Sequence, residues 1–112
     1  MDLSGLNCKP IKKGMSVLNI TEISSYKENL HPDWRIIGSR KIRRDFNFES
    51  FKQNIEFVNK VTEIAEKERH HPDIYNFCTK VTIELSTHAI RGLSENDFII
   101  ASKIDNLKGY LF

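Results

Sequence analysis

The chain has 112 residues, of which 39% are hydrophobic and 29% are charged, and its formal net charge is +2. This length and composition are typical of one globular domain and exclude a disordered chain. The small net charge does not favour nucleic-acid binding, and two cysteines make no disulfide framework. No apolar run approaches the roughly 20 residues of a membrane span, and no secretory signal opens the sequence. We therefore expect a cytoplasmic protein.

Residues 1–17 mix Gly and Pro with several Lys, which predicts a loose basic arm before one folded domain at residues 18–112. The stretch LNITEISSYKENL predicts the first helix. Its Asn19 and Glu22 have capping-box spacing, in which each side chain binds the other residue's backbone N–H. Pro32 ends the segment. Three aliphatic residues should share the buried face of this helix: Ile20, Ile23 and Leu30.

The stretches WRIIG and KIRRDFNF, separated by Gly-Ser-Arg, predict a β-hairpin. In the second strand, period-two alternation places Ile42, Phe46 and Phe48 on the core face. Arg44 falls on the same face, so it needs a partner or a route to solvent.

A long second helix should begin after Ser50, which forms a second capping-box pair with Gln53. It should end near Arg69, because His71 precedes Pro72 and is therefore extended. Five residues mark the predicted apolar stripe of this helix: Phe51, Ile55, Val58, Val61 and Ala65.

DIYNFC and KVTIELS predict two more strands, and the second alternates like a half-buried strand. Ser94 and Asp97 then resemble the N-cap of a last helix and its acidic third residue. The apolar stripe of that helix should consist of Ile100, Ile104, Leu107 and Leu111.

The order α-β-β-α-β-β-α predicts an α+β fold, a two-layer sandwich of a four-stranded antiparallel sheet with three helices on one face. One layer of helices cannot cover both faces of the sheet. We therefore expect the other sheet face and the stripe of the last helix to be buried between subunits.

The histidines raise the question of chemistry. Two of the four, His70 and His71, stand side by side in AEKERHHPDIYN, and His88 ends KVTIELSTH. A tight hairpin should return the end of the last strand to the start of the one before it. Glu66 would meet His70, four residues on, if the helix extends that far. Three imidazoles and a carboxylate could then share one rim and eliminate water by proton transfer without a metal.

Alternatives remain open at this point. The histidines could be exposed loop residues without a role, or zinc ligands together with Cys78, although CxxC and HxxxH are both missing. The stretch RKIRR could contact phosphate or form a solvated strand face. Trp34 could belong to the core or roof a planar ligand.

AEKERHHPDIYN, KVTIELSTH and GLSENDFIIASKID, with the upstream spacing of Trp, Gly, Ile, Arg and Phe, resemble the pterin-4a-carbinolamine dehydratase family from Leu18 to Leu107. That family is also known as the dimerisation cofactor of a homeodomain transcription factor. The resemblance implies dehydration of 4a-hydroxytetrahydrobiopterin to the quinonoid dihydropterin in tetrahydrobiopterin recycling. It also implies that pterin is the substrate, that no metal or other cofactor is needed, and that the protein is a homotetramer, a dimer of dimers.

The resemblance assigns catalysis to His70, His71 and His88. Arg69 departs from the family pattern, which often has an acid there, and Cys78-Thr79 replaces a common Tyr-Asn pair. The resemblance assigns pterin contacts to a further set: Glu66, Arg69, Ser86, Thr87, Ala89, Asp97 and Trp34.

A second function follows from the same resemblance, because relatives bind the dimerisation helices of a transcription factor. The alternative is thus a protein-binding module, a dimerisation cofactor or transcriptional coactivator, found also in the nucleus and contacting neither nucleic acid nor membrane directly. The intact histidines favour chemistry.

Overall fold

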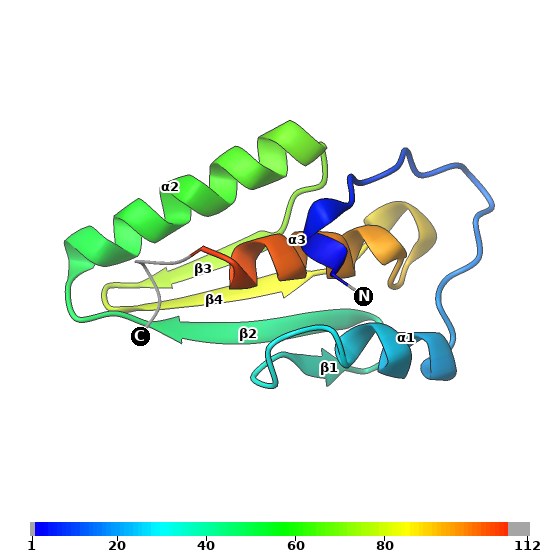
Figure 1. The fold of residues 1–112 in the computed structure, drawn as a ribbon, viewed down its shortest axis with the longest axis horizontal. Helices are drawn as coiled ribbons and strands as arrows, with labels where there is room; N and C mark the ends of the chain where they lie inside the picture. The colour runs from blue at the N-terminus through cyan, green and yellow to red at the C-terminus, as the bar shows by residue number, and fades with distance from the viewer. Residues whose placement is uncertain (1, 108–112) are drawn as a thin grey trace.

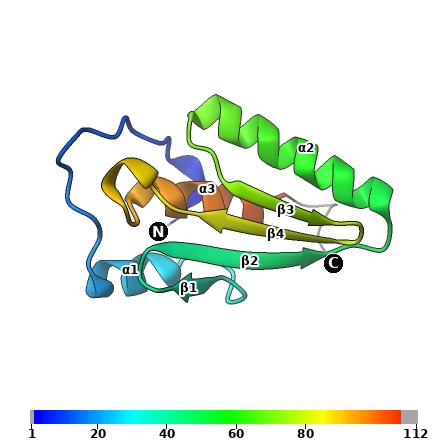
Figure 2. The same cartoon turned by 180° about the vertical axis from the view of Figure 1, so that it is seen from behind.

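The computed structural model describes residues 2–107. Figures 1 and 2 show helices packed against one face of an antiparallel sheet with strand order β1-β2-β4-β3, which confirms the predicted class and element order. Two short 3-10 turns, η1 and η2, are additional. The elements are η1 (Leu3–Gly5), α1 (Ile20–Lys27), β1 (Arg35–Ile37), β2 (Lys41–Asn47), α2 (Phe51–Glu68), β3 (Asp73–Phe77), β4 (Lys80–Leu85), η2 (His88–Ile90) and α3 (Glu95–Asp105).

Local capping signals place the helix starts. The capping box of α1 is complete, with Glu22 N donating to Asn19 at 2.9 Å and Asn19 N donating to Glu22 at 3.0 Å. At α2 only half of the predicted box forms. Gln53 N donates to Ser50 Oγ, but the Gln53 side chain accepts from Glu49 N, one residue earlier than expected. The first bond satisfies a donor that the helix itself leaves free, and the second ties the preceding residue to the first turn.

The predicted stripe of α2 is wrong at its N-terminal half. Phe51 is 56% exposed, and Asn54 and Phe57 face the core with Val61 and Ala65 instead. Asn54 can be buried because its Nδ2 donates to Asn76 at 2.8 Å and to the Cys78 carbonyl at 2.5 Å. The α1 stripe needs the same correction, since Ile20 is 72% exposed whereas Ile23 and Leu30 are buried.

The sheet has a covered and an open face. Ile42, Phe46, Val81 and Ile83 lie on the covered face, and all are buried. Arg44 points to the same side and finds the partner that the pattern requires. Its guanidinium lies 2.6 Å from Asp105 of α3, which also accepts from Trp34 Nε1 at 2.8 Å.

Helix α3 is a core helix. It lies across the sheet (Figure 1), and its residues from Asn96 to Ser102, with Ile104, are all buried. The expectation that its apolar stripe waits for another subunit is therefore wrong for Ile100 and Ile104. Leu107 packs half-buried on the core, and Leu111 lies outside the described residues.

Residues 3–9 are packed against the domain, which corrects the prediction of a loose arm for that part of the chain, whereas residues 12–17 are exposed. Leu3 is fully buried in the core, and the Lys103 ammonium donates to the Ser4 carbonyl at 2.7 Å. The backbone N–H of Cys8 donates to Glu68 at 2.7 Å. Burial raises the pKa of the Cys8 thiol to about 12, and the nearby Glu68 charge adds to this. The lysines of this segment suggested that it is exposed to solvent. The side chain of Leu3 instead packs in the hydrophobic core and holds the segment there.

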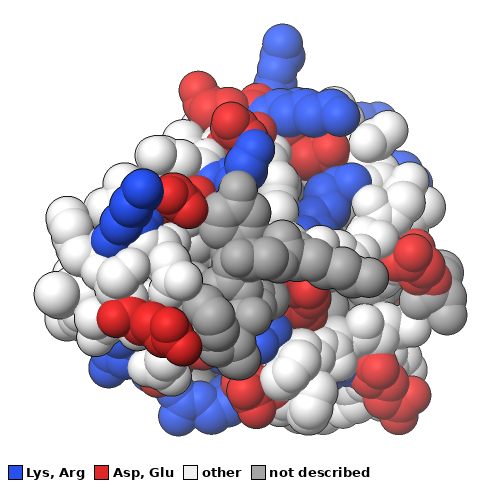
Figure 3. Space-filling view, turned by 60° about the vertical axis from the view of Figure 1, so that its left-hand side comes forward, with Lys and Arg blue, Asp and Glu red and all other residues white. Residues whose placement is uncertain are grey.

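The open face of the sheet carries aromatic and charged side chains around a hollow of 440 Å³. Tyr75 is 45% exposed and Phe77 is 55% exposed there. The prediction of an uncovered sheet face holds for this subunit, although Thr82 and Glu84 of the central strand are buried. On the side of the molecule in Figure 3, the basic and acidic side chains of the described residues are interspersed.

The packing of Leu3 predicts a stability difference between two neighbouring leucines. Leu3→Ala should lower the free energy of unfolding by about 3 kcal/mol, because it removes a buried side chain and leaves a cavity. Leu6, which is 38% exposed, is the matched control. Leu6→Ala should change the free energy of unfolding by less than about 1 kcal/mol. Urea denaturation measures both free energies. Equal effects of the two substitutions would contradict the packing of Leu3 and support the original prediction of a loose arm.

Candidate active site

The C-terminal end of α2 aims His70 at the interior. Arg69 ends the helix in the left-handed conformation (φ 54°), and the N–H groups of Arg69 and His70 both donate to the Ala65 carbonyl. This turn takes His70 off the helix, so it does not meet Glu66 as the four-residue spacing suggested. Its side chain is 10% exposed and points to α3.

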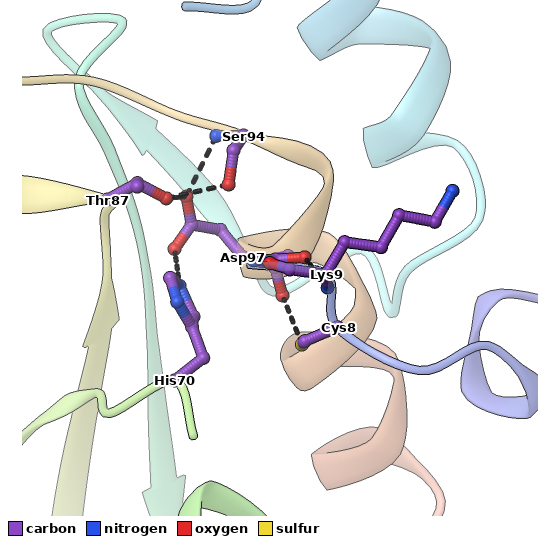
Figure 4. Close-up of polar contacts among 7 residues, drawn as sticks. Cys8, Lys9, His70, Thr87, Ser94 and Asp97 are labelled. Atoms are coloured by element: carbon purple, nitrogen blue, oxygen red, sulfur yellow. Dashed lines mark hydrogen bonds and ion pairs between the residues drawn. The ribbon is translucent and has the colours of Figure 1, made fainter. Parts of the chain in front are cut away.

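The carboxylate that meets His70 belongs to Asp97, the third residue of α3. His70 Nε2 lies 2.6 Å from Asp97 Oδ1 (Figure 4). The other oxygen, Oδ2, accepts from Thr87 Oγ1 at 2.8 Å and from Ser94 N at 3.0 Å. Thr87 and Ser94 are themselves 2.7 Å apart through their hydroxyls. Asp97 has no exposed surface, so these partners replace all of its water.

His71 faces solvent with Glu66 as its partner. Its Nε2 lies 2.7 Å from Glu66 Oε2, and the two side chains are 65% and 70% exposed. The pair forms because the left-handed turn at Arg69 swings the chain back past the last turn of α2. An exposed pair of this kind contributes little to stability, so both groups are available to a ligand.

The β3–β4 hairpin returns the third histidine to the same edge, as predicted. Asp73 pairs with Glu84, so the residues before β3 and those after β4 leave the sheet together. Thr87 therefore reaches Asp97, and His88 follows it as the first residue of η2. His88 is exposed and lines a hollow of 260 Å³ with Ser86. Within residues 2–107, no hydrogen bond or ion pair joins His88 to the other two histidines.

The remaining predicted contact residues divide by burial. Arg69 and Ala89 are exposed, and Ser86 is half-buried. Thr87 and Asp97 are buried and hold His70 rather than facing solvent. Trp34 is buried against Phe46 with its indole N–H on Asp105, which places it in the core of the subunit.

Sequence reasoning missed a second contact that steadies this end of α3. Asn96, next to Asp97, exchanges two hydrogen bonds with the backbone of Lys9, at 2.9 and 2.7 Å. The backbone N–H of Cys8, the residue before Lys9, donates to the carboxylate of Glu68, which lies two residues before His70. The N-terminal segment thus joins the last turn of α2, just before His70, to the start of α3, which carries Asp97. The only sign of this contact in the sequence is the polar Asn96 in the first turn of the last helix, among residues that are buried.

Two further features are negative. Among residues 2–107, no group of three or more His, Cys, Asp or Glu side chains is placed to hold a metal ion. Within the same residues, no helix is both long and apolar enough to span a bilayer.

The arrangement can carry out acid–base chemistry. A carboxylate that binds one imidazole nitrogen fixes the position of the ring and the segment that carries it, which describes His70. His71 and His88 are accessible from solvent and need no rearrangement to reach a small polar molecule.

The sequence profile of the family described as pterin 4 alpha carbinolamine dehydratase matches residues 16–107. The chain belongs to that family. A protein of Nitrosospira multiformis that bears the family's name provisionally is 44% identical over 106 residues, which are 95% of this chain and 92% of that protein. A similarly named protein of Alkaliphilus metalliredigens is 40% identical over 104 residues, covering 93% and 94% of the two chains. The resemblance read from the sequence is confirmed.

Solved structures agree with this family. A transcriptional coactivator/pterin dehydratase of Brucella melitensis superposes with a TM-score of 0.78 at 29% identity, over 84% of this chain and all of that one. A pterin dehydratase-like protein described as a RuBisCO assembly factor in the alpha-carboxysome gives 0.60 at 27% identity, over 70% of this chain and 93% of that one.

The shared carboxylate predicts coupled losses of stability. Asp97→Ala should lower the free energy of unfolding by about 3 kcal/mol, because it strands buried donors. Thr87→Val should cost about 1–2 kcal/mol, whereas Thr87→Ser, which keeps the hydroxyl, should cost less. The double variant Thr87→Val, Asp97→Ala should be less destabilised than the sum of the two. Strictly additive effects in thermal or urea unfolding would contradict a shared network.

Proposed function

We propose that this protein dehydrates pterin-4a-carbinolamine, with 4a-hydroxytetrahydrobiopterin as the reference substrate, by histidine acid–base catalysis. The hydroxyl leaves carbon 4a with its bonding electrons and takes a proton to become water. A proton leaves an adjacent ring nitrogen, and the new carbon–nitrogen double bond gives the quinonoid dihydropterin. The reaction is redox-neutral and needs no electron carrier, and we propose that the histidines carry it out without a metal or other cofactor.

The observation that carries this proposal is the link between the two histidine-bearing segments. Asp97 binds His70 from the end of α2 and Thr87, the neighbour of His88, from the end of β4. Both segments are thereby held at one end of the sheet in a chain that belongs to this family.

We assign the exposed imidazoles of His71 and His88 to proton transfer and the held imidazole of His70 to orientation. A proton donor and a proton acceptor must both reach the substrate, and these two rings are open to solvent. Glu66, bound to His71, would orient that ring or accept from the amino-pyrimidine edge of the pterin.

His88→Ala tests the assignment cleanly, because an exposed side chain contributes little to the fold. We expect dehydration of the carbinolamine to slow by a factor of roughly 10²–10⁴. His31→Ala is the matched control: His31 is also partly exposed, at 43%, and lies outside the histidine motif, so turnover should stay at the parent rate. A folded His88→Ala protein with parental turnover would end the proposal.

The same assay tests whether dehydration requires a bound metal ion. Full activity in excess chelator is expected if the histidines act alone. Stoichiometric zinc by elemental analysis, with activity lost on its removal, would instead support the zinc interpretation.

We also propose a homotetramer, a dimer of dimers. The outer sheet face with Tyr75 and Phe77 is one candidate interface. The solvent side of α2 is the other, because Phe51 is exposed there and Ile55 is half-buried outside the core. We also propose a second function, binding of a protein partner, because the similar Brucella protein is described as a coactivator as well as a dehydratase. The exposed apolar residues of α2 are a candidate surface for it.

Light scattering should give the mass of a tetramer at micromolar concentration. Phe51→Asp should reduce that mass by placing a charge in an apolar contact. Lys67→Gln, which changes the net charge by the same amount at an exposed position on the opposite side of the same helix, should leave the mass unchanged. A clean monomer for the parent protein would refute the assembly.

A further inference from the structure

Two hollows meet beside His88 and form one groove. The smaller, of 260 Å³, contains Ser86 and His88, and the larger, of 660 Å³, extends toward the start of α1 and the β1–β2 turn. Both are lined by Arg40, Arg91 and Gly92, so they adjoin at these residues. The smaller hollow lies at the low end of small-ligand pockets, so a ligand held at His88 would extend past the arginines.

The groove carries positive charge without compensation. Among the residues that the structure describes, no acidic side chain lines either hollow. Lys41 is already paired with Glu84 at 3.3 Å. Burial raises the pKa of Glu84, but hydrogen bonds from Arg43 and Lys41 outweigh it and hold that pKa below its usual value. In residues 2–107, Arg40 and Arg91 make no hydrogen bond or ion pair through their side chains, and both are exposed.

Both arginines stand on fixed turns. Arg91 adopts the left-handed conformation (φ 57°) in a loop closed by Thr87 N donating to Gly92 O at 2.7 Å. That loop packs tightly on the preceding segment, because a Cβ at Gly92 would lie 2.7 Å from Val17 Cγ1. Arg40 follows a left-handed Ser39, and its N–H donates to Ile37 O at 3.1 Å. The backbone at both arginines is therefore fixed, so that ligand binding has to order only the two side chains.

We propose that this groove binds an anionic substituent on carbon 6 of the pterin, so that the substrate class is pterins with a phosphate or carboxylate on the side chain. The inference rests on the proposed function, which places the ring at His88. The substituent leaves the ring next to the reacting centre and follows the groove to Arg40 and Arg91. Guanidinium groups bind phosphate and carboxylate through paired N–H donors, and an unpaired arginine gives up no existing partner to do so.

Binding to the full-length protein, followed by pterin fluorescence, tests this with neopterin, neopterin monophosphate and pterin-6-carboxylate. The monophosphate should bind at least about tenfold more tightly than neopterin, as expected for exposed charge-assisted hydrogen bonds. In Arg40→Ala combined with Arg91→Gly, the ratio of the two Kd values should fall to about one. Glycine suits the left-handed backbone at that position. Arg35→Ala, an exposed arginine outside the groove, should keep the parental ratio.

Equal Kd values for neopterin and its monophosphate in the parent protein would overturn the inference, as would a ratio that survives the double variant. Inorganic phosphate binding as tightly as the monophosphate would overturn it too, because the pterin would then contribute nothing. The acidic group, phosphate or carboxylate, that increases the affinity more identifies the preferred substituent. Turnover of the tetrahydrobiopterin carbinolamine separates the two proposals: no turnover refutes the dehydratase, whereas turnover with no preference for anionic pterins refutes the groove alone.

Discussion

Asp97 is a fully buried carboxylate, and the histidine end of the sheet depends on how it is satisfied. An unpaired carboxylate in this position would be strongly destabilising. It is tolerated because a helix N-terminus, a threonine hydroxyl and an imidazole all converge on it. The start of a helix also favours negative charge. Each partner comes from a different segment, so one side chain fixes α3, the end of β4 and the end of α2 against one another.

A second set of polar contacts supports this arrangement from the other side of α3. The backbone of Cys8 and Lys9 bonds Glu68 of α2 and Asn96 of α3, while Leu3 anchors the segment in the core. The stretch lies before the residues matched by the family profile, which begin at residue 16. Yet it joins the same two helix ends that carry the His70–Asp97 pair. The N-terminal segment is thus part of the scaffold that positions His70.

Local rules in the sequence predicted most of the fold. The capping residues of α1 and α3, the two hairpins and the end of α2 depend on neighbours a few residues away, and they were predicted correctly. The errors depend on distant contacts. Asn54 is buried in place of Phe51 because Asn76 and Cys78 satisfy its amide from another element. Leu3 packs against a helix near the opposite end of the chain, and no local pattern announces that contact.

The candidate site divides in the same way. The return of His88 to the edge that holds His70 follows from hairpin register, which is predictable from strand length. The carboxylate that meets His70 was expected to be Glu66, by helix spacing. The left-handed turn at Arg69 instead gives Glu66 to His71 and directs His70 to Asp97. A single backbone conformation thus decides which carboxylate serves which imidazole, and spacing rules for a continuous helix cannot foresee it.

Burial separates the groups that hold the site from those free to react. Asp97, Thr87 and Ser94 have almost no exposed surface, and His70 has little. His71 and His88, in contrast, keep their rings in solvent. A group that transfers protons must reach its substrate, whereas a group that sets geometry is most effective where its partners cannot exchange with water. Each exposed histidine follows a buried anchor in the sequence: His71 follows His70, and His88 follows Thr87. The buried network can therefore fix the backbone positions of the two exposed rings without occupying the space around them.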